Sequence, residues 1–148
     1  MDFDRQKKLT RYFEGRDAHA YQDSKGFWTI GYGRNIDKRN GPGLRESEMI
    51  FMLENDLRET EQHLMMALDF YRDLNAPRQA VLLDMAFNMG VAGLLKFHTM
   101  LERLRDKDYR GAATAMTQSK WKTDVGPRRW RPLFVMLSTG EWVGDVLT

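Results

Sequence analysis

The sequence contains no cysteine, and only four prolines and three histidines occur among its 148 residues. Without cysteine the chain can form no disulfide framework, no thiolate zinc site and no cysteine nucleophile. The histidines are scattered and no two lie at helical metal-ligand spacing, so we expect no metal site and no cofactor. Apolar runs such as residues 49–53 are five residues long, whereas a membrane span needs about 20. We therefore expect no stable membrane insertion.

The charges are nearly balanced but unevenly distributed. The 23 Lys and Arg against 21 Asp and Glu leave a net charge of +2, which is too small to predict nucleic-acid binding by itself. Residues 45–76 hold eight acids and three bases, whereas residues 120–131 hold five bases and one acid. The first residues lack the basic stretch and apolar run of a secretory signal, so we expect the protein to begin its life in the cytoplasm.

The sequence pattern predicts an α+β fold rather than alternating βαβ units. Residues 4–14 have helical spacing and end at Gly15, which is a natural helix stop. Residues 18–34 are aromatic, β-branched and glycine-punctuated, as in a β-hairpin or small meander. An apolar stripe then predicts a long helix over about residues 46–74, where most of the remaining positions are polar or acidic.

The remainder of the chain is predicted to be helical. One helix starts at the cap Asn75, tolerates Pro77 in its first turn and stops at Gly90. Further helices are expected at residues 94–105, 109–118, 127–137 and 140–146. The length suits a single domain, residues 1–148, with a β-rich lobe (15–45), a connecting helix (about 46–74) and a helical lobe (75–148) that includes the N-terminal helix.

Two carboxylates, Glu14 and Asp23, stand out among the acids because each lies at the end of an element facing the same early loop. Glycoside hydrolysis needs two carboxyl groups in unlike settings, one protonated among apolar neighbours and one ionised. Glu14 suits the acid and Asp23 the ionised group. A structural interpretation competes with this one, because an Asp at the head of a turn commonly binds its own backbone.

The spacing around these carboxylates resembles the catalytic segment of the phage-type lysozymes. Glu14 is followed after eight residues by Asp23 and, after five more, by Thr29 at the head of Thr-Ile-Gly-Tyr-Gly. Four later segments are also similar to that family, in order along the chain: Phe-Asn-Met-Gly at 87–90, Ser-Lys-Trp at 119–121, Pro-Arg-Arg at 127–129 and Thr-Gly-Glu-Trp at 139–142. The resemblance implies a lysozyme-like fold with a small β-containing N-terminal lobe and a larger helical C-terminal lobe joined by a long helix.

The resemblance also implies roles for individual residues. Glu14 would be the general acid, and Asp23 and Thr29 would hold the water that attacks the anomeric carbon, a geometry that favours inversion. Arg129 would lie beside Glu14 and orient it. The substrate-binding residues implied are Tyr32, Asn88, Lys120 and Arg129.

Four departures from the family pattern affect substrate contacts rather than the reaction, and they lie at Arg34, Asn88, Lys120 and Gly126. Lys120 stands where the family has Arg and so cannot make a bidentate contact, and Asn88 is one methylene shorter than the Gln of the family. The basic residues 120–131 have three interpretations. They could bind nucleic acid through phosphates and stacking, or line a cleft for an anionic wall polymer. Alternatively, Trp121, Trp130 and Trp142 could be core residues, as we expect for at least one of them.

The function implied by the resemblance is that of a muramidase, which cleaves the β-1,4 bond between N-acetylmuramic acid and N-acetylglucosamine. Its partner would be bacterial peptidoglycan and not nucleic acid. We expect a monomeric phage or prophage endolysin that accumulates in the host cytoplasm and reaches the wall through a holin-like protein. Two alternatives are a lytic transglycosylase, which needs no water-holding Asp23 and Thr29, and a non-catalytic wall-binding module.

Overall fold

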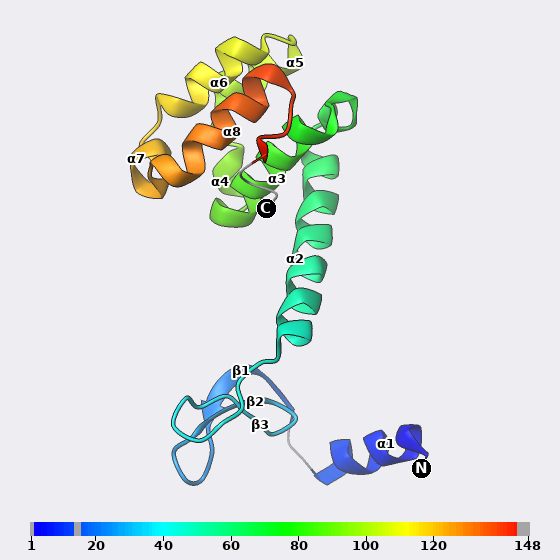
Figure 1. The fold of residues 1–148 in the computed structure, drawn as a ribbon. Helices are drawn as coiled ribbons and strands as arrows, with labels where there is room; N and C mark the ends of the chain where they lie inside the picture. The colour runs from blue at the N-terminus through cyan, green and yellow to red at the C-terminus, as the bar shows by residue number, and fades with distance from the viewer. Residues whose placement is uncertain (1, 14–15, 145–148) are drawn as a thin grey trace. The chain divides into compact units, whose positions relative to one another are not determined.

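The structure of the chain, a computed structural model, describes residues 2–13 and 16–144. It divides into two compact units, Met1–Leu53 and Glu54–Thr148 (Figure 1). The predicted α+β class is confirmed, because the described residues are mostly helical with one three-stranded antiparallel sheet. The elements in chain order are α1 (Phe3–Phe13), β1 (Asp17–Gln22), β2 (Trp28–Gly31), β3 (Arg34–Asn35), α2 (Glu46–Ala67), the 3₁₀ helix η1 (Tyr71–Asp73), α3 (Ala76–Met89), α4 (Val91–Leu94), α5 (His98–Arg105), α6 (Tyr109–Thr117), α7 (Trp121–Val125) and α8 (Pro127–Thr139).

The sheet of the first unit is the small meander that the sequence predicts. Its order is β1-β2-β3, and Thr29 of β2 pairs with Tyr21 on one side and with Asn35 on the other. The β2–β3 turn uses glycine where it must, since Gly31 and Gly33 have φ values of 68° and 79° that other residues rarely adopt. The predicted stop at Gly15 lies outside the described residues. The packing of the N-terminal helix with the helical lobe stays a prediction.

Helix α2 begins as predicted but ends earlier than the sequence suggests. Its first turn is capped by Glu48, whose Oε2 accepts the backbone N–H of Arg45 at 2.7 Å. It ends at Ala67, whereas the apolar stripe predicted a helix to about residue 74. Beyond Leu68 the backbone hydrogen bonds span three residues instead of four, as in the bond from Leu74 N to Tyr71 O. Within the described ranges, no helix is both long and apolar enough to cross a membrane.

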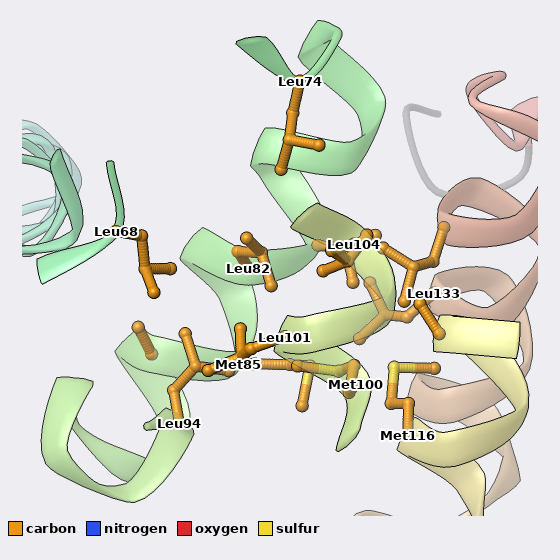
Figure 2. Packing of buried hydrophobic residues seen from close by; sticks show 14 of the residues in the cluster. Leu68, Leu74, Leu82, Met85, Leu94, Met100, Leu101, Leu104, Met116 and Leu133 are labelled. Carbon is orange, nitrogen blue, oxygen red and sulfur yellow. The ribbon is translucent and has the colours of Figure 1, made fainter. Parts of the chain in front are cut away.

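The core of the second unit is built around α3. Val81, Leu82 and Met85 are fully buried on one face of this helix. Side chains from α5, α6 and α8 close over that face, including Leu104 and Met116 (Figure 2). Burial of a single side chain of this kind contributes about 1.5–3 kcal/mol, so this cluster provides a rigid base for the polar residues on the outer faces of α3 and α8.

The predicted boundaries of α3 are confirmed, and its first turn also anchors α8. Asn75 is the N-cap, with its side-chain oxygen accepting from Arg78 N, and Gly90 ends the helix with φ 78°. The Asn75 amide donates to the carbonyl of Gly140 at 2.8 Å, and Arg78 Nε donates to that of Leu137 at 3.0 Å. These bonds satisfy carbonyls at the end of α8 that have no partner within the helix.

Two of the later helix predictions were wrong. The expected helix 94–105 ends as predicted but begins only at His98, because Phe97 leaves helical geometry at ψ 54° and its ring packs edge-on against Trp121. Leu94 is the last residue of the preceding helix α4. The expected helix 140–146 is absent from residues 141–143, where Gly140 in the left-handed conformation ends α8. Residue 144 has 3₁₀ geometry, and residues 145–146 of the expected helix lie outside the described residues.

Candidate functional site

The predicted acid Glu14 lies outside the described residues, directly after the last residue of α1. The other predicted site residues are described. Asp23, Thr29 and Tyr32 belong to the first unit, and Asn88, Lys120 and Arg129 belong to the second.

Asp23 closes the turn between β1 and β2. Its Oδ1 accepts the backbone N–H groups of Lys25 at 2.8 Å and of Phe27 at 2.9 Å. The main chain reinforces this turn, since Asp23 N donates to Phe27 O at 3.0 Å. The structural interpretation of Asp23 is therefore correct for Oδ1. In the part of the chain that the structure describes, Oδ2 accepts no hydrogen bond, which leaves one oxygen of the half-buried carboxylate for a ligand.

Thr29 is buried in β2, with 4 % of its surface exposed. Its hydroxyl donates to the carbonyl oxygen of Phe27 at 3.2 Å. Because the hydroxyl proton is used in that bond, Oγ1 can make a further hydrogen bond only as an acceptor, for example from a water molecule. Asp23 and Thr29 are both bonded to the backbone of Phe27, the first to its N–H and the second to its carbonyl oxygen.

Tyr32 lies in the turn after β2 and is 39 % exposed. The guanidinium carbon of Arg11, on α1, lies 5.1 Å from the centre of its ring. This cation–π contact connects α1 with the sheet within the first unit.

Asn88 and Lys120 lie at one end of the helical unit. Trp121, which is buried, donates its indole N–H to Asn88 Oδ1 at 3.2 Å and so fixes the side chain of this otherwise exposed residue. Lys120 precedes α7, and its exposed ammonium group makes no ion pair with another described residue. A pocket of about 620 Å³ opens here, lined among others by Lys96, Lys120 and Trp121.

Arg129 makes a contact that the sequence did not predict. Its Nε and Nη2 donate to the two oxygens of Asp84, each at 2.9 Å, in a bidentate pair between α8 and α3. This bond is the main cause that raises the pKa of Arg129 above its ordinary value. The expected contact between Arg129 and Glu14 stays a prediction, because Glu14 lies outside the described residues. The partner that the structure shows for Arg129 is Asp84. One signal in the sequence could have indicated Asp84, since it is an acid among the apolar positions of α3.

The Asp84–Arg129 pair is predicted to stabilise the second unit. The side chains are 38 % and 34 % exposed, so solvent screens the pair and we expect Asp84→Asn to cost about 1 kcal/mol. For a chain of this size that loss lowers the melting temperature by roughly 2–4 °C. Asp69→Asn is the control, because it removes the more exposed Arg105–Asp69 pair. Equal melting temperatures for the two variants would contradict the prediction.

Within the basic segment 120–131, Lys122 and Arg131 lie beside a tryptophan, whereas Arg129 forms the ion pair with Asp84. Lys122 Nζ lies 4.5 Å and Arg131 Cζ 5.7 Å from the ring centre of Trp130, which is half-buried. Trp121 is buried, whereas Trp142 is 47 % exposed. The prediction that at least one of these tryptophans belongs to the core is confirmed for Trp121.

Comparisons with known proteins match the chain over most of its length. The sequence model of the phage lysozyme family matches residues 11–134. "Probable T4-type lysozyme 1" of Dictyostelium discoideum is 26 % identical over 161 residues, covering 90 % of this chain and 94 % of the relative. An endolysin of Acyrthosiphon pisum secondary endosymbiont phage 1 is 27 % identical over 122 residues, covering 82 % and 80 %. The pre-baseplate central spike protein Gp5 of Enterobacteria phage T4 is 28 % identical over 157 residues, covering 88 % of this chain but 27 % of the spike protein.

Proposed function

The chain belongs to the phage lysozyme family, and from this premise we propose that it is a muramidase acting on bacterial peptidoglycan. The bond cleaved is the β-1,4 linkage between N-acetylmuramic acid and N-acetylglucosamine. Family membership supports the broader class, a lysozyme-like glycosidase of the wall. The resemblance to the family supports the particular bond, and the hydrogen bonds of Asp23 and Thr29 support the reaction.

The observation that carries the proposal is that Asp23 and Thr29 are each hydrogen-bonded to the backbone of the same residue, Phe27. A carboxylate oxygen free of protein hydrogen bonds and a hydroxyl that can only accept are complementary to the two hydrogens of one water molecule. Such a water has its lone pairs directed away from both groups, toward an electrophile. This arrangement supports hydrolysis, since a reaction without water has no use for it.

The proposed reaction is a single displacement. Glu14 protonates the glycosidic oxygen as the bond from that oxygen to the anomeric carbon of the muramic acid breaks. The water forms the new bond to that carbon from the opposite face, and its proton passes to Asp23, so the configuration is inverted. Glu14 then regains a proton from solvent as Asp23 releases one. The resemblance to the family is what supports the remaining roles, with Arg129 proposed to orient Glu14, and Tyr32, Asn88 and Lys120 proposed to bind the glycan and its peptide stem.

The proposed biological role is that of an endolysin of a phage or prophage. One relative carries that name, and another is a phage spike protein. In this role the monomeric protein accumulates in the host cytoplasm, reaches the wall after a holin-like protein opens the membrane, and is released on lysis. Expression in a host with and without a holin tests this role separately from the chemistry.

Analysis of the products of purified peptidoglycan tests the reaction. We expect new reducing ends on N-acetylmuramic acid, initially in the α configuration, because attack by water on a β linkage inverts the anomeric carbon. A non-reducing anhydro end would identify a lytic transglycosylase instead. Binding to the polymer without soluble products would identify a wall-binding module, and either result would overturn the proposed reaction.

A further inference from the structure

The loop after β3 contains a buried carboxylate that the proposed reaction does not use. Asp37 is 3 % exposed, and its two oxygens accept four hydrogen bonds. Three come from Arg39, through its backbone N–H at 2.9 Å, Nε at 2.8 Å and Nη2 at 2.7 Å. The fourth comes from the backbone N–H of Trp28 at 3.1 Å. Asp37 therefore connects its own loop to the first residue of β2.

Arg39 extends the same connection to the turn before β2. Its Nη2 also donates to the carbonyl of Gly26 at 2.8 Å, and its guanidinium carbon lies 5.1 Å from the ring centre of Phe27. The Asp37–Arg39 pair thus contacts Gly26, Phe27 and Trp28 in sequence. A planar guanidinium with donors in a fixed fork can make all of these contacts at once, which an ammonium group cannot.

Phe27 is the residue on which both proposed water-holding groups depend. Asp23 Oδ1 accepts its N–H, and Thr29 Oγ1 donates to its carbonyl oxygen. The backbone on either side of Phe27 is held by the Asp37–Arg39 pair, through Gly26 O and Trp28 N. A shift of this peptide would move the two groups together, and a displacement of 1 Å is enough to cost on the order of 100-fold in rate.

We propose that the Asp37–Arg39 ion pair is a positioning device that fixes the backbone at Phe27 and thereby the relative placement of Asp23 and Thr29. This inference rests on the proposed function for its effect on catalysis, but its effect on the turn is independent of it. The hydrogen bonds from Arg39 hold the pKa of Asp37 far below its ordinary value. The pair therefore remains charged over the pH range in which a lysozyme is assayed.

The test replaces Arg39, whose side chain is 59 % exposed, with glutamine. We expect Arg39→Gln to lower kcat by about 10-fold with KM changed less than about twofold, because the water-holding pair is displaced while the glycan-binding residues are untouched. Amide hydrogen exchange at Lys25 and Phe27, whose N–H groups bind Asp23, should accelerate. Arg39→Lys keeps the charge but loses the fork, so we expect an intermediate kcat.

The matched control is Glu48→Gln, in the same unit. It weakens the Arg34–Glu48 and Arg45–Glu48 pairs but keeps a side-chain oxygen for the cap at Arg45 N, and we expect wild-type kcat. A loss of kcat in Arg39→Gln no greater than its loss of folded protein would overturn the inference, as would unchanged exchange at Phe27. If the wild-type protein hydrolyses no peptidoglycan, the proposed function fails, while the exchange measurement still decides whether the pair positions the turn.

Discussion

Replacing Glu14 with glutamine is expected to reduce hydrolysis of purified peptidoglycan by roughly 10²–10⁴-fold, the usual contribution of a general acid. Glutamine has the size and hydrogen-bonding reach of glutamate but no proton acidic enough to transfer to the leaving oxygen. Because it is nearly isosteric, we expect the variant to fold normally and to bind the polymer. Turbidity loss of outer-membrane-stripped cells and release of reducing ends measure the effect.

A matched change elsewhere separates loss of the acid from loss of a charge. Glu59 is exposed on α2, so Glu59→Gln removes the same charge at a position without a proposed role and should keep wild-type activity. Circular dichroism and melting temperature must agree for the two variants. If Glu14→Gln folds normally and clears peptidoglycan as well as wild type does, then Glu14 is not the general acid.

Local signals in the sequence predicted those parts of the fold that depend on neighbouring residues. The hairpin around residues 18–34 and the start and stop of α3 follow from turn and cap residues acting within a few positions. Asn75, Pro77 and Gly90 perform the roles expected of them. At such positions the residue itself determines the backbone conformation, so tertiary contacts do not alter the predicted helix boundary.

The wrong helix boundaries occur where an apolar residue is packed in the interior, as its pattern predicts, but its backbone is not in an α-helix. Leu68 and Tyr71 continue the apolar stripe of α2 and are buried, as the stripe predicts. They lie, however, in a turn and a 3₁₀ helix, and the periodicity of apolar residues cannot distinguish these from a continuing α-helix. Phe97 likewise fits a helical pattern, but its packing against Trp121 interrupts the helix. The correction at Phe97 comes from a contact between segments that are distant in sequence.

The residues of the candidate site likewise fall into those that a local motif predicts and those whose role depends on a distant segment. Asp23 and Thr29 were identified because their spacing matches a motif within a single hairpin. Asp84 was not, because its partner Arg129 lies 45 positions further along the chain and no motif connects them. Asp37 was also missed, since its role depends on the return of its loop to Trp28. Residues that support a site from another segment leave little trace in a single sequence.

Asp23→Asn is expected to separate the catalytic role of this residue from its structural one. Asparagine keeps an oxygen that can accept the N–H groups of Lys25 and Phe27, so the turn should form and the melting temperature should stay near that of wild type. The variant lacks a basic oxygen to take the proton of the attacking water. We expect kcat to fall by roughly 100-fold or more with KM largely unchanged.

Asp23→Ala provides the contrast, because it removes the acceptor as well as the charge. Two backbone N–H groups then lose their partner, and at about 0.5–1.5 kcal/mol for each bond the variant should be measurably less stable. Thermal melts of wild type, Asp23→Asn and Asp23→Ala, with kcat and KM for each, distinguish the roles. Equal losses of turnover and substrate binding in Asp23→Asn would contradict the catalytic role and leave the turn as the function of Asp23. A selective loss of turnover in a stable protein would require that the free carboxylate oxygen acts on the water.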